Sequence, residues 1–124
     1  TPQLVYGTVD TNLSVQETEE NTGEKVMEPT TAARLRAYME STARFGTARI
    51  GAPQNCVSGI KTGTAQTGVY DENGEEIENY WYAGYVCNAQ EEPLYTLVVL
   101  EETAGETHVP QAFRKIGEAL VDFN

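Results

Sequence analysis

The chain reads VSGIKTGTAQTGVY from residue 57 to 70, DENGEE from 71 to 76 and IENYWYAGYVC from 77 to 87. The outer two segments are rich in β-branched, aromatic and hydroxyl-bearing residues, which favour strands. Asn73-Gly74, within the turn, is the strongest two-residue hairpin signal because both positions tolerate positive φ. We therefore predict an antiparallel hairpin with strands at about 57–71 and 76–88.

Two helices and a third strand are expected around this hairpin. Apolar residues from Leu35 to Phe45 recur at i, i+3, i+4 and i+7, which predicts a helix over about 31–44, capped by Thr30 or Thr31 and ended by Gly46. LYTLVVLEE, after Pro93, predicts a strand over about 94–101.

The end of the chain carries a second apolar stripe. It predicts an amphipathic helix over about 109–123 that packs on the sheet, with Pro110 in its first turn. The stripe comprises Val109, Phe113, Ile116, Leu120 and Phe123. The order helix, three antiparallel strands, helix is an α+β arrangement in a single domain segment of 1–124. Residues 1–29 are expected to be extended chain and loop, and residues 30–124 to form the core.

Composition excludes several functions. Nineteen acidic and eight basic residues give a net charge of −11, so we expect no nucleic-acid partner. The longest apolar run, from Leu94 to Leu100, is far shorter than the roughly 20 residues of a membrane span. Cys56, Cys87 and His108 do not have the spacing of a zinc site, so we predict no metal and no cofactor. The acidic clusters are interpreted as solvated surface.

SGIKTGTAQTG, residues 58–68, carries the chemistry of interest. It lacks the order of a phosphate-binding loop, in which the lysine follows the glycines and opens a helix. A flexible linker is a second interpretation, but Ile60, Val69 and the following turn favour an ordered strand. A third interpretation rests on Lys61-Thr62-Gly63: a positive charge, a hydroxyl and a bare backbone on a strand suit the binding of a carboxylate.

The context of this motif resembles a known family. GIKTGTAQTG, then NYWYAGYV, EPLYTLVVLEE and a C-terminal helix are similar to the end of the transpeptidase domain of penicillin-binding proteins, and KTGTAQ resembles the class B, monofunctional members. The helix TAARLRAYMESTARFGTA and the opening TPQLV extend the resemblance over most of the chain. It implies an incomplete transpeptidase fold of the β-lactamase-like type.

The resemblance also implies roles for individual residues. Lys61 would polarise the proton relay and attract the substrate carboxylate, and the hydroxyls of Thr62 and Thr64 would bind that carboxylate or its β-lactam equivalent. Gly63 would leave room for the ligand. The backbone N–H of Thr64 would be an oxyanion donor, and Gln66 would touch bound ligand.

Two other motifs of the family are absent. The only literal S-x-x-K is Ser58-Gly59-Ile60-Lys61, and on a strand its serine and lysine point to opposite faces. We interpret Ser58 as a strand-entry residue. No S-x-N occurs, and Asp10-Thr11-Asn12 is only a look-alike. We therefore expect a C-terminal segment with no nucleophile, which alone neither processes stem peptides nor reacts with penicillin.

The parent enzyme implied by the resemblance cross-links peptidoglycan stem peptides through a serine acyl-enzyme, binds β-lactams and faces outward from the bacterial cytoplasmic membrane, whereas the segment itself is expected to be soluble. The alternatives are a β-lactam sensor, a serine β-lactamase relative or a non-enzymatic secreted binding module. The family sheet has five strands, so strand 94–101 would be an open apolar edge here, and we predict self-association through it.

The remaining unusual residues are expected to be structural. Trp81 and the tyrosines at 80, 82 and 85 are interpreted as core and cross-strand packing. A two-residue turn at Asn73-Gly74 would set Cys87 opposite Ile60 and Cys56 opposite Glu91, roughly 13 Å apart along the ladder. This separation favours free thiols, unless a bulge near Gly59 or an irregular loop brings the cysteines together. His108 is interpreted as a surface or capping residue.

Overall fold

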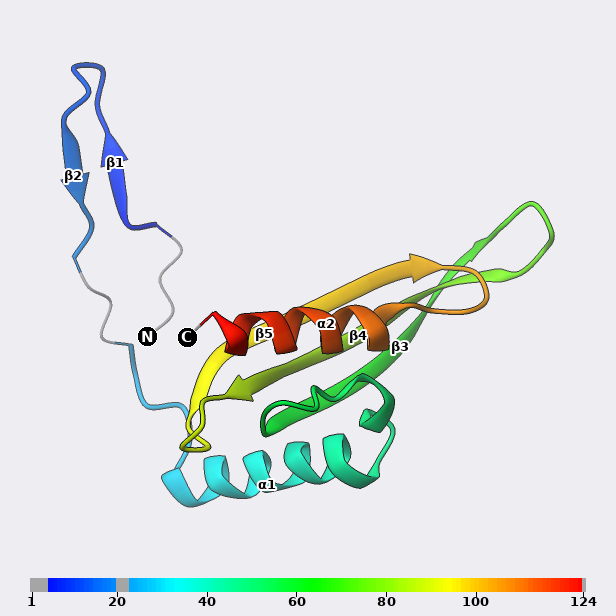
Figure 1. Cartoon of the computed structure of the whole chain (residues 1–124). Helices are drawn as coiled ribbons and strands as arrows, with labels where there is room; N and C mark the ends of the chain where they lie inside the picture. Colours follow the sequence, from blue (N-terminus) through cyan, green and yellow to red (C-terminus); the bar gives the residue numbers. More distant parts are fainter. Residues whose placement is uncertain (1–4, 20–22, 124) are drawn as a thin grey trace.

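The computed structural model describes residues 5–19 and 23–123 (Figure 1). Residues 1–4 of the opening TPQLV lie outside this description. The elements are, in order, β1 (Gly7–Val9), β2 (Val15–Glu17), α1 (Pro29–Phe45), the short 3-10 helix η1 (Arg49–Gly51), β3 (Ser58–Tyr70), β4 (Glu76–Cys87), β5 (Pro93–Thr103) and α2 (Val109–Asp122). The predicted α+β fold, with three antiparallel strands between two helices, is confirmed, and the main elements agree with the predicted ranges to within two residues.

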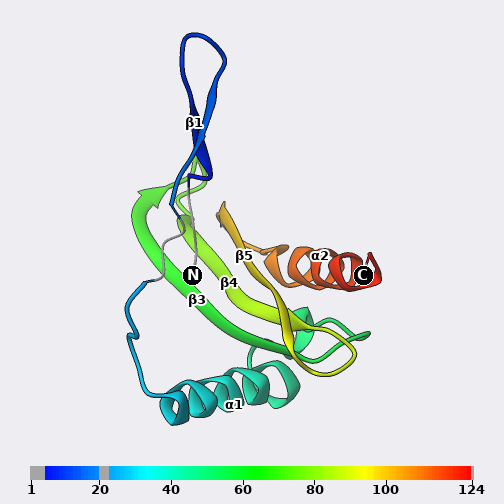
Figure 2. The same cartoon turned by 90° about the vertical axis from the view of Figure 1, so that its left-hand side faces the viewer.

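The three long strands form one twisted sheet in the order β3-β4-β5. Figures 1 and 2 show α2 along the sheet beside β4 and β5, whereas α1 lies beside the first part of β3. Phe113 of α2 is fully buried, and its ring packs against that of Tyr82 of β4 with centroids 5.8 Å apart. Ile60 of β3 is also fully buried, so the core lies where the first half of β3 meets both helices.

The apolar stripe of α2 packs on the sheet only in part. Val109 and Phe113 are buried, as predicted, but Gly117 is the third buried position. Ile116 is 43% exposed and Phe123 is 89% exposed, so the prediction that they lie on the sheet is wrong. A Cβ at Gly117 would lie 2.7 Å from Pro53, which explains why the smallest residue occupies the contact point.

Helix α1 begins earlier than its hydroxyl residues suggest. Its N-cap is Glu28, which makes no capping bond with its side chain, and Pro29 occupies the first turn. Thr30 and Thr31 lie inside the helix, so neither is the cap that we predicted. Proline suits the first helical position because its missing N–H has no intrahelical partner there. Gly46 ends the helix as predicted, donating its N–H to the Thr42 carbonyl.

The N-terminal region is more regular than the expected extended chain and loop. Strands β1 and β2 pair antiparallel, with Thr8 opposite Gln16, and the hairpin projects away from the main sheet (Figure 1). Asp10 stabilises its turn, since its carboxylate accepts the N–H groups of Asn12 and Ser14 at 2.8 and 2.9 Å. Such local bonds from aspartate favour turns.

The turn of the long hairpin differs from the predicted two-residue type. Gly74 has a φ of +83°, but Asn73 does not have positive φ. The carboxylate of Asp71 accepts the N–H groups of Asn73 and Glu75 at 2.8 and 2.9 Å, and Asp71 pairs with Glu75 through the backbone. A three-residue loop closed by a left-handed glycine therefore replaces the two-residue turn.

A bulge near Gly68 shifts the register further. Gly68 has a φ of +72°, and its N–H donates to the Glu76 carboxylate at 3.0 Å, while the Thr67 hydroxyl donates to the Ile77 carbonyl. The pairing changes between Gln66 and Tyr70, so that Ile60 faces Gly84. The predicted opposition of Cys87 and Ile60 is wrong, because the longer turn moves the register by one residue and the bulge moves it by two.

The cysteines lie closer together than that register implied. Cys87 donates its N–H to the Val57 carbonyl at 2.9 Å, so Cys56 is one residue away from the partner of Cys87. The separation of roughly 13 Å is therefore wrong, although both cysteines are free thiols as we expected. Burial is the main reason why the pKa values of both thiols are raised.

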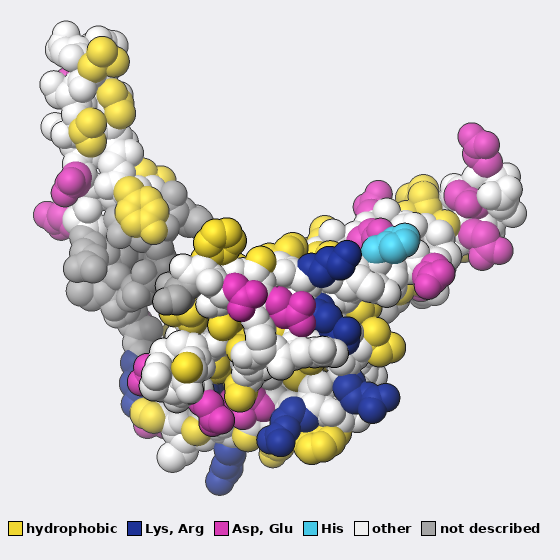
Figure 3. Space-filling view, in the orientation of Figure 1, with side chains coloured by type: hydrophobic (Ala, Val, Ile, Leu, Met, Phe, Trp, Pro, Cys, Tyr) yellow, Lys and Arg dark blue, Asp and Glu magenta, His cyan; other side chains and the backbone are white. Residues whose placement is uncertain are grey.

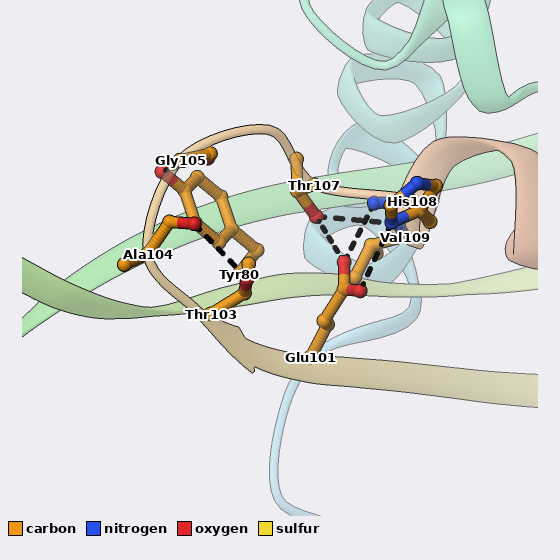
Figure 4. A network of polar contacts seen from close by, with 8 residues as sticks. All are labelled: Tyr80, Glu101, Thr103, Ala104, Gly105, Thr107, His108 and Val109. Atoms are coloured by element: carbon orange, nitrogen blue, oxygen red, sulfur yellow. Dashed lines mark hydrogen bonds and ion pairs between the residues drawn. The ribbon is translucent and has the colours of Figure 1, made fainter. Parts of the chain in front are cut away.

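A polar network joins the end of β5 to the start of α2 (Figure 4). The Glu101 carboxylate accepts the His108 N–H at 2.6 Å and the Thr107 hydroxyl at 2.7 Å, and the Thr107 oxygen accepts the Val109 N–H. These bonds hold the pKa of Glu101 below its ordinary value. His108 is the N-cap position of α2 and is exposed, as predicted.

Within 5–19 and 23–123, no helix is long and apolar enough to cross a membrane.

Candidate functional site

The predicted site residues lie on the middle of β3, at the edge of the sheet. Lys61, Gly63, Thr64 and Gln66 are exposed, and Thr62 is partly buried. The Lys61 ammonium donates to the carbonyl of Thr62, its neighbour on the strand. A cation is thus held against the backbone of the strand in a solvent-accessible position.

The ladder directs two backbone donors of β3 away from the sheet. Residues 57 and 87 form a hydrogen-bonded pair, because Cys87 donates to the Val57 carbonyl. Such pairs alternate along an antiparallel ladder, so the N–H groups of Thr62 and Thr64 point away from β4. In the described sheet no strand pairs with this edge of β3, so a ligand from solution can reach the exposed N–H of Thr64.

Side chains fix the two ends of this segment differently. The Thr62 hydroxyl lies 3.0 Å from that of Thr47, in the loop after α1. Thr47 could not be recognised from the sequence, because its loop has no periodic pattern. At the other end, the Gln66 amide donates to the Glu76 carboxylate at 3.1 Å, so this conformation of Gln66 is set by β4.

Trp81 lies directly opposite Gly63 on the neighbouring strand and is 38% exposed. The predicted register paired Gly63 with Gly84, so it did not place Trp81 beside the lysine motif. A Cβ on Gly63 would lie 3.6 Å from the Trp81 side chain, an ordinary contact, so packing does not require glycine here. The surface of the strand beside Lys61 is bare at Gly63 and flanked by an indole ring.

The other aromatic residues are structural, as predicted. Tyr82 is buried in the core, and burial raises its pKa. The Tyr85 hydroxyl donates to the Glu40 carboxylate of α1 at 2.8 Å, and the Arg36 guanidinium lies over the Tyr85 ring. Tyr80 donates to Glu78 at 2.6 Å, and this bond raises the pKa of the tyrosine.

Ser58 is separated from the lysine that follows it at i+3. It begins β3, as predicted, and is 6% exposed, whereas Lys61 is exposed. Residues three apart on a strand point to opposite faces, so this serine cannot pass a proton to this lysine. Among the residues that the structure describes, no cluster of three or more His, Cys, Asp or Glu side chains could hold a metal ion.

The site therefore combines a cation, hydroxyl groups and outward backbone donors on an open strand edge, which together can bind a carboxylate and stabilise a developing oxyanion. Neither curated proteins nor solved structures gave a match. The family described as penicillin binding protein transpeptidase domain matches residues 1–118. The chain belongs to the penicillin-binding protein transpeptidase domain family.

Proposed function

We propose that these 124 residues form one wall of the active site of a class B, serine-type D,D-transpeptidase that cross-links peptidoglycan stem peptides and is inhibited by β-lactams. The observation that carries the proposal is the open edge of β3, where Lys61 lies beside the outward N–H groups of Thr62 and Thr64. The family match supports the reaction class. The 124 residues contain neither S-x-x-K on a helix nor S-x-N, so the proposal assigns the nucleophile to another part of the enzyme.

Each residue of the wall has a distinct part in this proposal. Lys61 supplies the positive charge that attracts the substrate carboxylate and polarises the proton relay. The hydroxyls of Thr62 and Thr64 bind the carboxylate, and the Thr64 N–H donates to the oxyanion. Bare backbone at Gly63 admits the ligand, and Gln66 contacts it after exchanging its bond with Glu76.

The first experiment separates wall from nucleophile. We expect the chain of residues 1–124, incubated with a fluorescent penicillin, to keep its unmodified mass in intact-protein mass spectrometry. A covalent adduct would place a nucleophile in this chain and overturn the proposal. The coding sequence upstream of Thr1 should encode S-x-x-K and S-x-N, and their absence would equally refute it.

The second experiment measures how much Lys61 and Thr62 contribute to the acylation rate of the longer protein. Lys61→Ala should slow acylation by penicillin by about 100-fold, the scale on which preorganised electrostatic groups contribute. Thr62→Val should slow it less. Lys115→Ala, which removes an exposed lysine from α2, is the matched control and should leave the rate unchanged. Equal rates for the Lys61 and Lys115 variants would exclude the assigned role of Lys61.

Location and assembly follow from the same proposal. The parent enzyme lies at the outer face of the bacterial cytoplasmic membrane, where its substrate is.

In the 124-residue chain β5 is an edge strand, with Val98 56% and Leu100 48% exposed. Such an edge favours strand pairing with a second copy. Sedimentation velocity at high concentration should show self-association, and a strictly monomeric chain would contradict it.

A further inference from the structure

A cavity of about 430 Å³ lies at the N-terminal end of β3, away from the exposed part of the strand that carries Lys61. It is open to solvent on one side and is lined by the last turns of α1, the segment from η1 into β3, α2, and Glu91 of the β4–β5 connection. Its lining stops at Ser58 on the strand and includes none of residues 61–66. The volume lies within the range of about 300–1,000 Å³ typical of small-molecule pockets.

Three arginines from three different elements line this cavity: Arg44 of α1, Arg49 of η1 and Arg114 of α2. In Figure 3, Lys and Arg side chains gather around α2 and α1, whereas acidic side chains dominate the tip of the β3–β4 hairpin. Acidic residues outnumber basic ones by 19 to 8. Even so, none of the three arginines has a carboxylate within 4.0 Å in the described part of the chain.

Arg114 is held in place by the backbone. Its Nε donates to the Ala52 carbonyl at 3.1 Å, and its Nη2 donates to the Ile50 carbonyl. These bonds leave Nη1 without an acceptor among residues 5–19 and 23–123. A guanidinium whose position is already fixed loses little conformational entropy when it binds an anion.

Ser58 adds a second polar group that lacks a partner. It is 6% exposed and lines the cavity, yet its hydroxyl makes no hydrogen bond within the described residues. The Ser58 hydroxyl is therefore free to donate to an occupant of the cavity.

The carboxylates of the cavity do not cancel its positive charge. Glu40 accepts the Tyr85 hydroxyl and pairs with Arg36 at 3.5 Å, so its charge is already countered. Glu91 is exposed at the rim. Glu118 lies beside the lining, where its carboxylate accepts the N–H of Gln54 at 3.0 Å. The three arginines of the lining still outnumber Glu91 and Glu118. Ala43 and Pro53, both buried, provide apolar wall between the charged groups.

We propose that this cavity binds a small organic monoanion that presents a carboxylate to Arg49 and Arg114 and buries a compact apolar body against Ala43 and Pro53. Arginine forks match the two oxygens of a carboxylate. Ser58 donates a further hydrogen bond. The site is separate from the lysine wall of β3, and it depends on neither the nucleophile nor the substrate of the proposed transpeptidase.

Benzoate is the probe, and benzamide, its neutral analogue, is the control. We expect benzoate to shift the backbone amide NMR signals of residues 43–58 and of α2 near Arg114, with millimolar affinity, while signals of 61–66 stay in place. Benzamide should leave the cavity signals unchanged. Equal shifts with benzamide, or no shifts in the cavity with benzoate, would overturn the proposal. Equal affinity for inorganic phosphate, which has no apolar body, would overturn the assignment to a carboxylate.

Two arginine variants complete the test. Arg49→Gln should weaken benzoate binding by about tenfold, the effect of losing one charge-assisted hydrogen bond. Arg34→Gln removes the same charge from an exposed position of α1 outside the cavity and should bind benzoate like the unmodified chain. The amide spectrum shows directly that each variant is folded. Equal weakening by both substitutions would mean that net charge alone attracts the anion, which would refute the site.

Discussion

The two parts of β3 differ although they belong to one continuous strand. From Ser58 to Ile60 the residues are buried between the helices, and from Lys61 to Tyr70 most are exposed. The first part contributes to the hydrophobic core, while the second contributes backbone donors and a cation to an open edge. The comparison shows that one continuous strand can be anchored in the core at one end and left exposed at the other.

Truncation at the anchored part should have the largest effect. Ile60 is fully buried, so Ile60→Ala should lower the free energy of unfolding by about 2–5 kcal/mol. Val69, on the same strand, is 56% exposed, and Val69→Ala should change it by less than about 0.5 kcal/mol. Urea denaturation followed by circular dichroism measures both. Similar losses for the two variants would mean that the core extends along the whole strand.

Adding a methyl group at each of two glycines tests the same difference between the buried and the exposed part of the sheet. A Cβ at Gly84, which faces Ile60, would lie 2.1 Å from the Gly59 carbonyl oxygen, so Gly84→Ala should destabilise the fold by about 1–3 kcal/mol. Gly63→Ala, where the nearest atom is 3.6 Å away, should leave thermal stability nearly unchanged. A melting temperature reduced equally by both would refute the open character of the edge at Gly63.

These particular residues also show what could be predicted from the sequence. The strand and helix ranges followed from local periodicity, and the position of Lys61 on an exposed strand followed from the motif. The identity of the residue opposite Gly63 depended on register. One extra residue at the Asp71–Glu75 loop and a bulge at Gly68 moved Trp81 there, and neither has a pattern that distinguishes it from a regular hairpin. The cavity arginines come from three elements, so only the packed fold brings them together.

Acid should weaken the link between β5 and α2, a smaller effect. Hydrogen bonds from His108 and Thr107 lower the pKa of Glu101 in the folded chain. Their stabilisation is therefore complete above the ordinary glutamate pKa of about 4.3 and is lost as the pH falls through the lower folded value. Glu101→Gln should reduce the melting temperature at neutral pH and flatten its fall in acid.

Glu106→Gln is the matched control, because Glu106 is exposed in the same connection and makes no hydrogen bond within the described residues. Its melting temperature should follow that of the unmodified chain from neutral pH to acid. If the melting temperature of Glu101→Gln fell with decreasing pH as steeply as that of the unmodified chain, the network of Figure 4 would not contribute to pH-dependent stability.

The smallest expected effect is local opening of the chain at the buried start of β3, which the reactivity of the two cysteines can measure. Burial raises the pKa of both thiols, which lowers the reactive thiolate fraction at neutral pH. Cys87 is fully buried and holds the Val57 carbonyl through its N–H, whereas Cys56 is partly exposed. Iodoacetamide should therefore modify Cys56 first and Cys87 at least about tenfold more slowly, because Cys87 reacts only when the strand end opens. In urea the two rates should become equal. Equal rates in the folded chain would instead mean that the pairing of Val57 with Cys87 opens as readily as the exposed edge, and the two parts of β3 would no longer differ in rigidity.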